Sequence, residues 1–283
     1  MKRIASIQDF SCLGKCSQTV ALPVLSAMGL ECAALPTALL SAHTAFDGFV
    51  SYDLTPQLPP MVRHWQQLGL QFDAIYTGYL GSAEQIALVL RFFDEFPAPL
   101  RFVDPVMGDH GRLYAGFSAD FPAQLRRLCG RAEVISPNVT EACLLTGQPY
   151  RPMQTQDEVR ALLEGLLALG ARNAVVTGVR LDEKTMAVAA MQAGERRLWL
   201  HPTPYFAAVF HGAGDLFAAT AAGALTLGRP LLESLALAAD YTALTLHATL
   251  DDPERRWYGV NFETTLPELM RRLSLLPRPE DEL

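Results

Sequence analysis

Short apolar runs alternate with longer amphipathic stretches along the first 180 residues. Such alternation predicts βαβ units, a mainly parallel sheet and helices on both of its faces. The predicted strands are Arg3–Ile7, Glu31–Leu35, Ala74–Thr77, Arg101–Val103, Glu133–Ile135 and Ala174–Thr177. The predicted helices between them are Thr19–Met28, Met61–Leu68, Ala83–Glu95, Ala119–Leu128, Thr140–Thr146 and Gln156–Leu169.

The pattern changes after Thr177. Residues 186–191 and 196–200 have the character of two strands joined as a hairpin, and helical patterns then cover 215–227 and 231–250. Without an internal repeat or a low-complexity linker, we expect one domain over residues 1–283, with a loose tail from residue 270. The segment 37–60 has weak periodicity, and its pattern fits a surface loop and a flap over a site equally well.

Composition restricts the partners. The net charge of -7 argues against nucleic acid or an anionic membrane as the main partner. The basic N-terminus precedes no apolar segment, and the longest apolar run, 216–227, is shorter than the ~20 residues of a membrane helix, so we expect a soluble, cytoplasmic protein. Five cysteines without a Cys-x-x-Cys pair predict reduced thiols and no zinc site.

The glycine-rich turn His211-Gly212-Ala213-Gly214-Asp215 leads directly into an Ala/Leu-rich helix. The first helical turn has unpaired N–H groups and a partial positive charge, and glycines let a phosphate approach that backbone. Asp215 would then accept a proton from an attacking hydroxyl group, or it would simply cap the helix. The turn is not a Walker A loop, because Gly14-Lys15 lacks the upstream glycine and the following Ser or Thr.

Two further polar turns follow predicted strands. Asp104-Pro105-Val106-Met107-Gly108-Asp109 offers two carboxylates where open α/β sheets bind ligands, and such oxygens suit Mg²⁺ held with phosphates, or the segment is a polar turn in which Asp109 pairs with a surface cation. In Pro137-Asn138-Val139-Thr140-Glu141, the spacing of Asn138 and Glu141 predicts a capping box, although the same glutamate could reach the water shell of a metal. A parallel sheet would gather all three turns along one edge.

These motifs together resemble the ribokinase-like superfamily, an αβα sandwich with a small flap. Ser41-Ala42-His43-Thr44, Thr77-Gly78-Tyr79-Leu80-Gly81-Ser82 and an Asp-x-Ser-x-x-Gly-x-Cys-Ser string from Asp9 to Ser17 are similar to its pyridoxal and pyridoxamine kinase branch. The resemblance runs from about residue 2 to residue 250. It implies transfer of phosphate from ATP to the 5′-hydroxymethyl group of a vitamin B6 vitamer, usually in a homodimer that uses Mg²⁺ and often a monovalent cation such as K⁺.

The resemblance also implies roles for single residues. Asp215 would be the catalytic base, and Gly212, Ala213 and Gly214 would be the other catalytic residues. The ATP side is Asp104, Asp109, Tyr114, Asn138, Glu141, Thr177, Gly178, Gly212 and Gly214, with Mg²⁺ organised by Asp104 and Glu141. The pyridine pocket is lined by Asp9, His43, Thr44 and Tyr79 beside Asp215.

The chain departs from this pattern at two positions. Ala213 stands where the family usually has Thr or Ser, so we expect reduced rather than abolished activity, and Asp9 stands where many pyridoxal kinases have Ser, which would favour a cationic vitamer such as pyridoxamine. The alternatives are a hydroxymethylpyrimidine kinase, which typically has Cys at the position of Asp215, and a non-catalytic B6-binding protein. A sugar kinase fits less well, because the early Gly-Gly segment is missing.

Overall fold

The computed structural model describes residues 1–195 and 197–277, and their main feature is one nine-stranded sheet. Its strands lie in the order β11-β10-β9-β8-β5-β4-β1-β2-β3, and the six from β9 to β2 are parallel. The parallel strands are β1 (Arg3–Ser11), β2 (Glu31–Leu40), β4 (Ala74–Thr77), β5 (Leu100–Val103), β8 (Val134–Ile135) and β9 (Asn173–Arg180). The antiparallel edges are β3 (Ser51–Asp53) on one side and β10 (Thr185–Gln192) with β11 (Trp199–Pro204) on the other.

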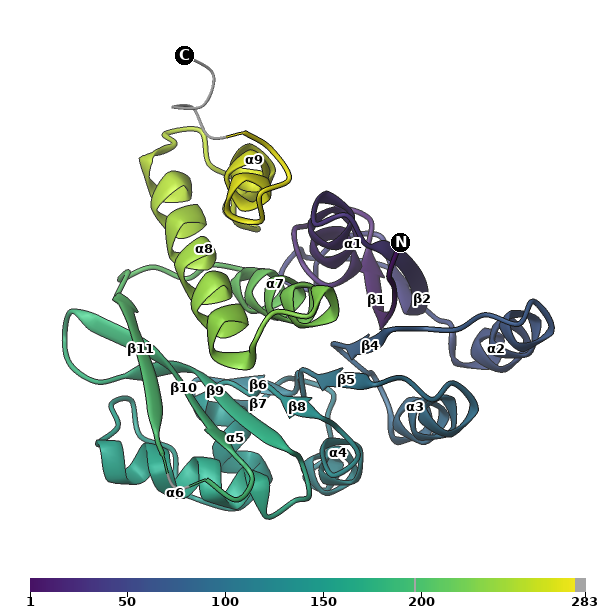
Figure 1. Ribbon diagram of the computed structural model, residues 1–283, viewed down its shortest axis with the longest axis horizontal. Helices are drawn as coiled ribbons and strands as arrows, with labels where there is room; N and C mark the ends of the chain where they lie inside the picture. Colours follow the sequence, from purple (N-terminus) through teal and green to yellow (C-terminus); the bar gives the residue numbers. More distant parts are fainter. Residues whose placement is uncertain (196, 278–283) are drawn as a thin grey trace.

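Helices cover both faces of this sheet, which confirms the predicted αβα arrangement (Figure 1). One face packs against α2 (Leu58–Gln67), α3 (Ala83–Glu95), α4 (Phe121–Cys129), α5 (Val139–Thr146) and α6 (Gln156–Leu167). The other packs against α1 (Gln18–Ala27), α7 (Ala213–Leu227), α8 (Leu231–Asp251) and α9 (Phe262–Arg272). The buried apolar side chains form two hydrophobic cores, one on each side of the sheet. The parallel strands are largely apolar because both of their faces are buried in these cores.

The order of the strands determines where ligands can bind. The chain leaves β1 toward β2 on one side and leaves β4 toward β5 on the other, so the connections diverge between the neighbouring strands β1 and β4. Such a switch point opens a crevice at the carboxyl ends of the strands. Helix α1 follows β1 on one face and α3 follows β4 on the other, in agreement with this rule.

Three predictions differ from the structure by more than small shifts of an element's ends. Strand β2 continues to Leu40 and pairs with β3, so part of the segment 37–60 is sheet rather than loop. The second hairpin strand begins at Trp199 instead of 196, a position outside the described residues. The predicted start of the tail at residue 270 is too early, because α9 continues to Arg272 and buries Leu269. Residues 278–283 of the predicted tail lie outside the described residues.

A two-stranded flap stands apart from the main sheet. It pairs β6 (Gly108–Asp109) with β7 (Arg112–Leu113), and the two residues between them, His110 and Gly111, both have positive φ. Positive φ at both turn positions is the signature of a tight two-residue hairpin. The short 3₁₀ helix η1 (Thr55–Gln57) completes the elements.

All five cysteines are free, as predicted. Within residues 1–195 and 197–277, no helix has the length and apolar character needed to cross a membrane.

Candidate active site

The carboxyl ends of the parallel strands place the predicted site residues along one edge of the sheet. Asp9 lies near the end of β1, Tyr79 just after β4, and Asp104 just after β5. Asn138 follows β8 and forms a bridge with Thr177 of β9. Parallel strands therefore do what the sequence analysis expected: they gather polar turns that lie far apart along the chain.

The glycine turn is shaped by contact with an early part of the chain. Gly212 is the N-cap of α7 and has a left-handed backbone with φ 79°. A Cβ atom at Gly212 would lie 1.9 Å from the backbone oxygen of Lys15, so only glycine fits. By contrast, Gly214 is exposed, and a Cβ atom there would meet no atom within 4 Å. Space is therefore open beside Gly214 in the first helical turn, where helix N–H groups lack intrahelical partners, as an anion site requires.

Asp215 lies in this first turn and is partly buried. Its pKa is raised to about 6, mainly by burial and to a smaller extent by the charge of Asp9, against the lowering effect of the Ser17 backbone. A carboxyl group with such a pKa is ionised at neutral pH and still basic enough to accept a proton from a hydroxyl group.

Asp104 and Glu141 form a second acidic pair. Burial and the charges of Glu141 and Asp215 raise the pKa of Asp104 well above its usual range. Glu141 accepts hydrogen bonds from the Met107 N–H at 3.0 Å and the Asn138 N–H at 2.8 Å, yet burial raises its pKa to about 8. In the described part of the chain, the Asp104 side chain has no hydrogen bond of its own. Buried carboxylates so close together call for a cation.

Asn138 connects this pair to the flap. It forms the predicted capping box with Glu141, and its Nδ2 donates to the Gly108 carbonyl at 2.9 Å. Asp109 is exposed on the flap. Tyr114 follows the flap, and burial together with the charge of Glu141 raises its pKa. On the far side, Gly178 is exposed with φ 69°, which leaves open backbone next to Thr177.

The acceptor side of the crevice holds Asp9, Tyr79 and His43. Asp9 is buried, and the charge of this carboxylate contributes to the raised pKa of Tyr79, although burial is the larger cause. The His43 ring lies 4.6 Å from the His211 ring, measured between centroids, which ties the segment after β2 to the glycine turn. Thr44 is exposed one residue further on.

The chain is similar in sequence and in fold to known proteins. A model of the phosphomethylpyrimidine kinase family matches residues 30–254. The chain belongs to this family. A pyridoxal kinase of Rubrobacter xylanophilus is 31% identical over 265 residues, covering 89% of this chain and 88% of the relative. A Bacteroides thetaiotaomicron structure described as a phosphomethylpyrimidine kinase with pyridoxal has a TM-score of 0.90 and 37% identity, covering 98% of this chain and 97% of that chain. A Lactobacillus plantarum pyridoxal kinase has a TM-score of 0.88 and 33% identity, covering 98% and 100%.

The residues present fit a Mg²⁺–nucleotide pair. Asp104 offers a buried carboxylate without an internal donor, beside an open helix N-terminus. Within residues 1–195 and 197–277, no group of three or more His, Cys, Asp or Glu side chains forms a metal cage. This is the donor set expected when Mg²⁺ takes one or two carboxylates and completes its shell with phosphate oxygens and water.

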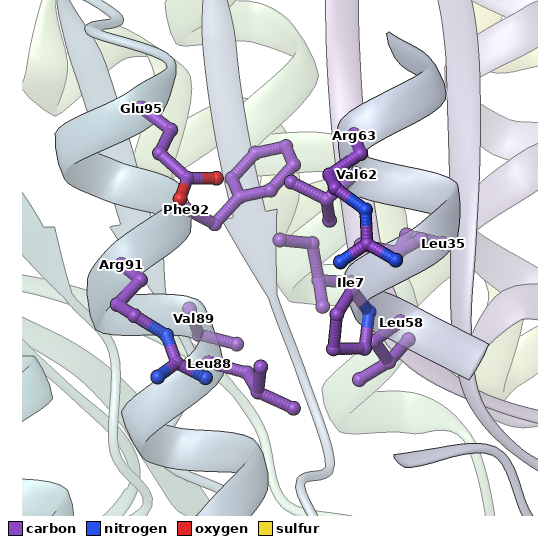
Figure 2. Close-up of a pocket in the computed structure, with 11 residues that line it drawn as sticks. Ile7, Leu35, Leu58, Val62, Arg63, Leu88, Val89, Arg91, Phe92 and Glu95 are labelled. Atoms are coloured by element: carbon purple, nitrogen blue, oxygen red, sulfur yellow. The ribbon is translucent and has the colours of Figure 1, made fainter. Parts of the chain in front are cut away.

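A separate cavity of about 360 Å³ lies between α2 and α3, away from this edge. Ile7, Leu35 and Phe92 form part of its apolar wall, and Arg63 and Arg91 lie at it from opposite helices (Figure 2). It contains none of the family's acidic turns, so we assign the chemistry to the sheet edge instead.

Sequence reasoning did not find the residues that hold the acceptor side together. Ser17 interacts with both Asp9 and Asp215, and Trp257 lies 6.3 Å from His211 between ring centroids. For Ser17 the sequence did contain a signal, because residues 9–17 are similar to a string found in the family. Trp257 lies beyond the segment that resembles the family, and its role depends on a fold-level contact across more than 40 residues of chain.

Proposed function

We propose that this chain transfers the γ-phosphoryl group of ATP to the 5′-hydroxymethyl group of a vitamin B6 vitamer. The decisive observation is the position of Asp215, which interacts electrostatically with Asp9 on the acceptor side and with Asp104 on the phosphate side. A base in that position can act on a hydroxyl group while the adjacent helix amides hold the phosphate. Relatives and structures named for pyridoxal support the choice of acceptor.

In this mechanism Asp215 removes the hydroxyl proton as the 5′-oxygen bonds to the γ-phosphorus. The bond between that phosphorus and the β,γ-bridging oxygen breaks, and ADP leaves. The N–H groups of Gly212, Ala213 and Gly214 would stabilise the negative charge on the transferring group. Ala213 provides only its backbone donor, which is the basis for expecting lower activity than with Thr.

Asp104 and Glu141 would organise Mg²⁺ and its waters, while Asn138, Thr177, Gly178 and the flap residues Asp109 and Tyr114 would border the nucleotide. A monovalent cation such as K⁺ is a further candidate cofactor. Its support is that Thr77 Oγ1 and Ser136 Oγ are buried without a hydrogen-bond partner among the described residues, at strand ends beside Asp104. Such oxygens need water or a cation.

The acceptor would lie against Asp9, His43, Thr44 and Tyr79. We further propose a cytoplasmic, single-domain protein that forms a homodimer. The single sheet supports one domain, and free cysteines suit a reducing compartment. The exposed edge strand β3 supports self-association, because an unpaired strand edge is a template for pairing.

Hydroxymethylpyrimidine is the second candidate acceptor, since the matching family model has that description. A substrate panel with Mg·ATP, covering pyridoxal, pyridoxamine, pyridoxine and hydroxymethylpyrimidine, separates the two. We expect the largest kcat/KM for a B6 vitamer. A larger value for hydroxymethylpyrimidine would replace the proposed substrate, and binding of pyridoxal without turnover would indicate a non-catalytic protein.

Asp215→Asn tests the base directly. We expect kcat to fall by about 10²–10⁴-fold with little change in ATP affinity, because only proton removal is lost. In the wild type, kcat/KM should fall about tenfold per pH unit below about 6, as Asp215 becomes protonated. An Asp215→Asn variant with full activity would refute the assignment.

A further inference from the structure

The segment Gly14–Ser17 contacts the glycine turn, and the proposed mechanism gives this segment no role. The backbone oxygen of Lys15 lies against Gly212, at 1.9 Å from where a Cβ atom would be. The aliphatic part of the same lysine lies against Gly259, whose Cβ atom would be 2.3 Å from the Cβ of Lys15. One residue therefore sits between the glycine turn and the segment that joins α8 to α9.

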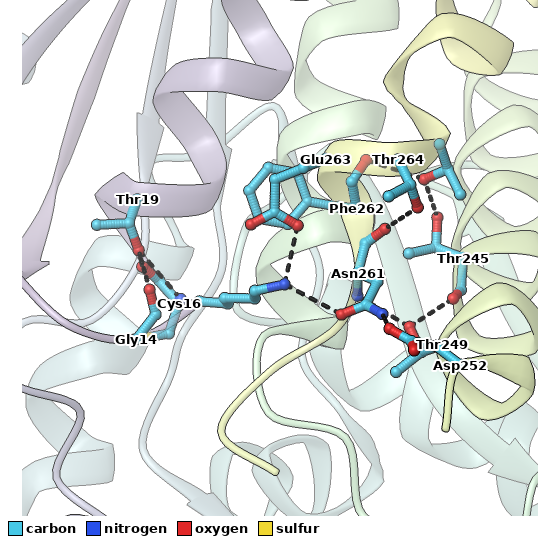
Figure 3. A network of polar contacts seen from close by, with 12 residues as sticks. Gly14, Cys16, Thr19, Thr245, Thr249, Asp252, Asn261, Phe262, Glu263 and Thr264 are labelled. Atoms are coloured by element: carbon cyan, nitrogen blue, oxygen red, sulfur yellow. Dashed lines mark hydrogen bonds and ion pairs between the residues drawn. The ribbon is translucent and has the colours of Figure 1, made fainter. Parts of the chain in front are cut away.

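The ammonium group of Lys15 is held at its far end. It donates to Asn261 Oδ1 at 3.1 Å and to Glu263 Oε2 at 2.9 Å, and the lysine side chain is only 16% exposed. Asn261 is itself fixed, because its Nδ2 donates to Asp252 Oδ2 at 2.7 Å and its N–H donates to Thr249 at 2.9 Å (Figure 3). The anchor is thus part of a network that reaches into α8.

Two residues later, Ser17 has a backbone conformation that non-glycine residues rarely adopt, with φ 49° and ψ -127°. Strain of this kind persists where surrounding structure enforces it, often at a functional site. Ser17 lies next to both carboxylates, and its backbone lowers the pKa of Asp215 while its side chain lowers that of Asp9. The contact of Gly14 with His43, 3.0 Å from a virtual Cβ to the His43 Cβ, adds a third link to the acceptor side.

We infer that Lys15 is a positioning residue, which uses Asn261 and Glu263 as an anchor to hold the Gly212 turn and the Asp215 carboxylate in register. This inference rests on the proposed function and deepens it. It assigns a role in the reaction to the segment 252–263, most of which lies beyond the matched family region of residues 30–254. A small displacement of a catalytic group can lower a rate strongly, so the anchor matters for kcat.

The lysine itself is not proposed to bind phosphate. Its ammonium group already has a carboxylate and an amide oxygen as partners, and both lie at the start of α9. Loss of the ammonium group should therefore affect kcat and leave the KM for ATP nearly unchanged. That division separates positioning from direct binding.

The test is Lys15→Met, which keeps an unbranched stem against Gly259 and removes both hydrogen bonds. We expect kcat to fall about ten- to hundredfold, with the KM values for ATP and the B6 vitamer within about twofold of the wild type. Lys15→Arg should restore much of the activity. Arg131→Met is the matched control, since it removes an ion pair to Asp94 of 2.6 Å that lies away from the site.

A second readout is the acid limb of the kcat/KM profile. If Lys15 keeps the Ser17 N–H group on Asp215, Lys15→Met should move that limb to higher pH, because an N–H donor stabilises the carboxylate. The other groups that interact electrostatically with Asp215 are unchanged in the variant: Asp9, Cys16, Tyr76, Asp104 and Tyr114. A merely structural lysine would lower Tm without moving the limb.

Glu263→Gln provides a milder change in case Lys15→Met does not fold. In the double variant its effect on kcat should not add to that of Lys15→Met, because both remove the same contact. Unchanged kcat and an unchanged acid limb in folded Lys15→Met or Glu263→Gln would overturn the inference. So would a rise in KM for ATP alone. Full activity of Asp215→Asn would instead refute the proposed base, which keeps the two failures distinct.

Discussion

At the scale of single residues, the candidate site is a group of carboxylates whose pKa values are shifted mainly by burial. Asp9, Asp104, Glu141 and Asp215 all have raised pKa values, with burial as the largest cause in each. Mutual repulsion adds to it. Such a group does not stabilise the free protein, but in the proposed mechanism it would bind Mg²⁺ and supply the base, which is a common conflict between stability and activity.

Asp9 should select among B6 vitamers. It is 5% exposed and interacts with Ser11 and Ser17, so an ionised carboxylate there would favour a cationic aminomethyl group. For Asp9→Ser, we expect the ratio of kcat/KM for pyridoxamine to that for pyridoxal to fall about tenfold, the value of one charge-assisted hydrogen bond. Asp9→Asn is the control of equal size. A ratio that does not move would show that Asp9 is not the selector.

Asp104→Asn should stabilise the ligand-free protein at high pH. The folded-state pKa values of Asp104 and Glu141 lie above their unfolded values, so the folded state binds more protons, and stability is lost as pH rises from about 4.5 toward about 8. Removing one charge of the pair should raise Tm at pH 8 by at least about 2 °C, or roughly 1 kcal/mol in a chain of this size. Activity should fall sharply.

Thermal unfolding of both proteins at pH 5 and pH 8, with and without Mg·ATP, measures this. At pH 5 the variant should gain less, since Glu141, whose pKa is raised to about 8, is then largely protonated and no longer repels Asp104. A lower Tm for Asp104→Asn at pH 8 would contradict the electrostatic account.

At the scale of elements, the beginning of α7 combines an N-cap that must be glycine with an open first turn. Gly212 needs its left-handed φ of 79° and close contact with Lys15, whereas Gly214 has free space around it. The two glycines should therefore respond differently to the same substitution.

Gly212→Ala should lower stability by about 1–2 kcal/mol from backbone strain alone, and more from the clash with Lys15, as measured by urea unfolding. Gly214→Ala should leave stability unchanged or raise it by up to about 1 kcal/mol, since alanine favours a helix. Its kcat/KM for ATP should nevertheless fall, because a methyl group would occupy the space of the phosphate. Unchanged ATP kinetics for Gly214→Ala would place the phosphate elsewhere.

At the scale of the whole molecule, one edge of the sheet is exposed to solvent and carries apolar side chains. At one edge β3 is fully exposed, and four large side chains on or beside it are exposed as well: Leu39, Phe49, Val50 and Tyr52. An apolar patch on an unpaired strand supports the proposed self-association. A two-fold pairing of these edges would cover it.

Tyr52→Lys should therefore shift the protein from dimer to monomer in light scattering coupled to gel filtration. A lysine on an edge strand opposes pairing with a second edge. Leu68→Lys is the control, since Leu68 is 59% exposed at the end of α2. A wild-type protein that is already monomeric at micromolar concentration would contradict the proposed dimer.

The sequence by itself determined the class of fold and the chemistry of the turns. Periodicity is local, so runs such as Ala74–Thr77 and Ala83–Glu95 were placed with their observed bounds, and the capping box of Asn138 and Glu141 followed from spacing alone. The same local character explains the misses. The extension of β2 to Leu40 depends on pairing with β1 and β3, which are distant in sequence or weakly patterned. Helix α9 contains Pro267, which argues against a helix until the packing of α9 against α8 is known.

Only the tertiary structure decided which residues share the site. Parallel strands bring Asp9 and Asp104 to one edge of the sheet, and the first turn of α7 brings Asp215 close enough to interact with both carboxylates. The pKa values of those groups depend on burial and on neighbours distant in sequence, which no spacing rule contains. The contact of Lys15 with Gly212, Gly259 and Glu263 is of the same kind, because its partners lie some 200 or more residues away along the chain and become neighbours only when the sheet and both helical layers are assembled.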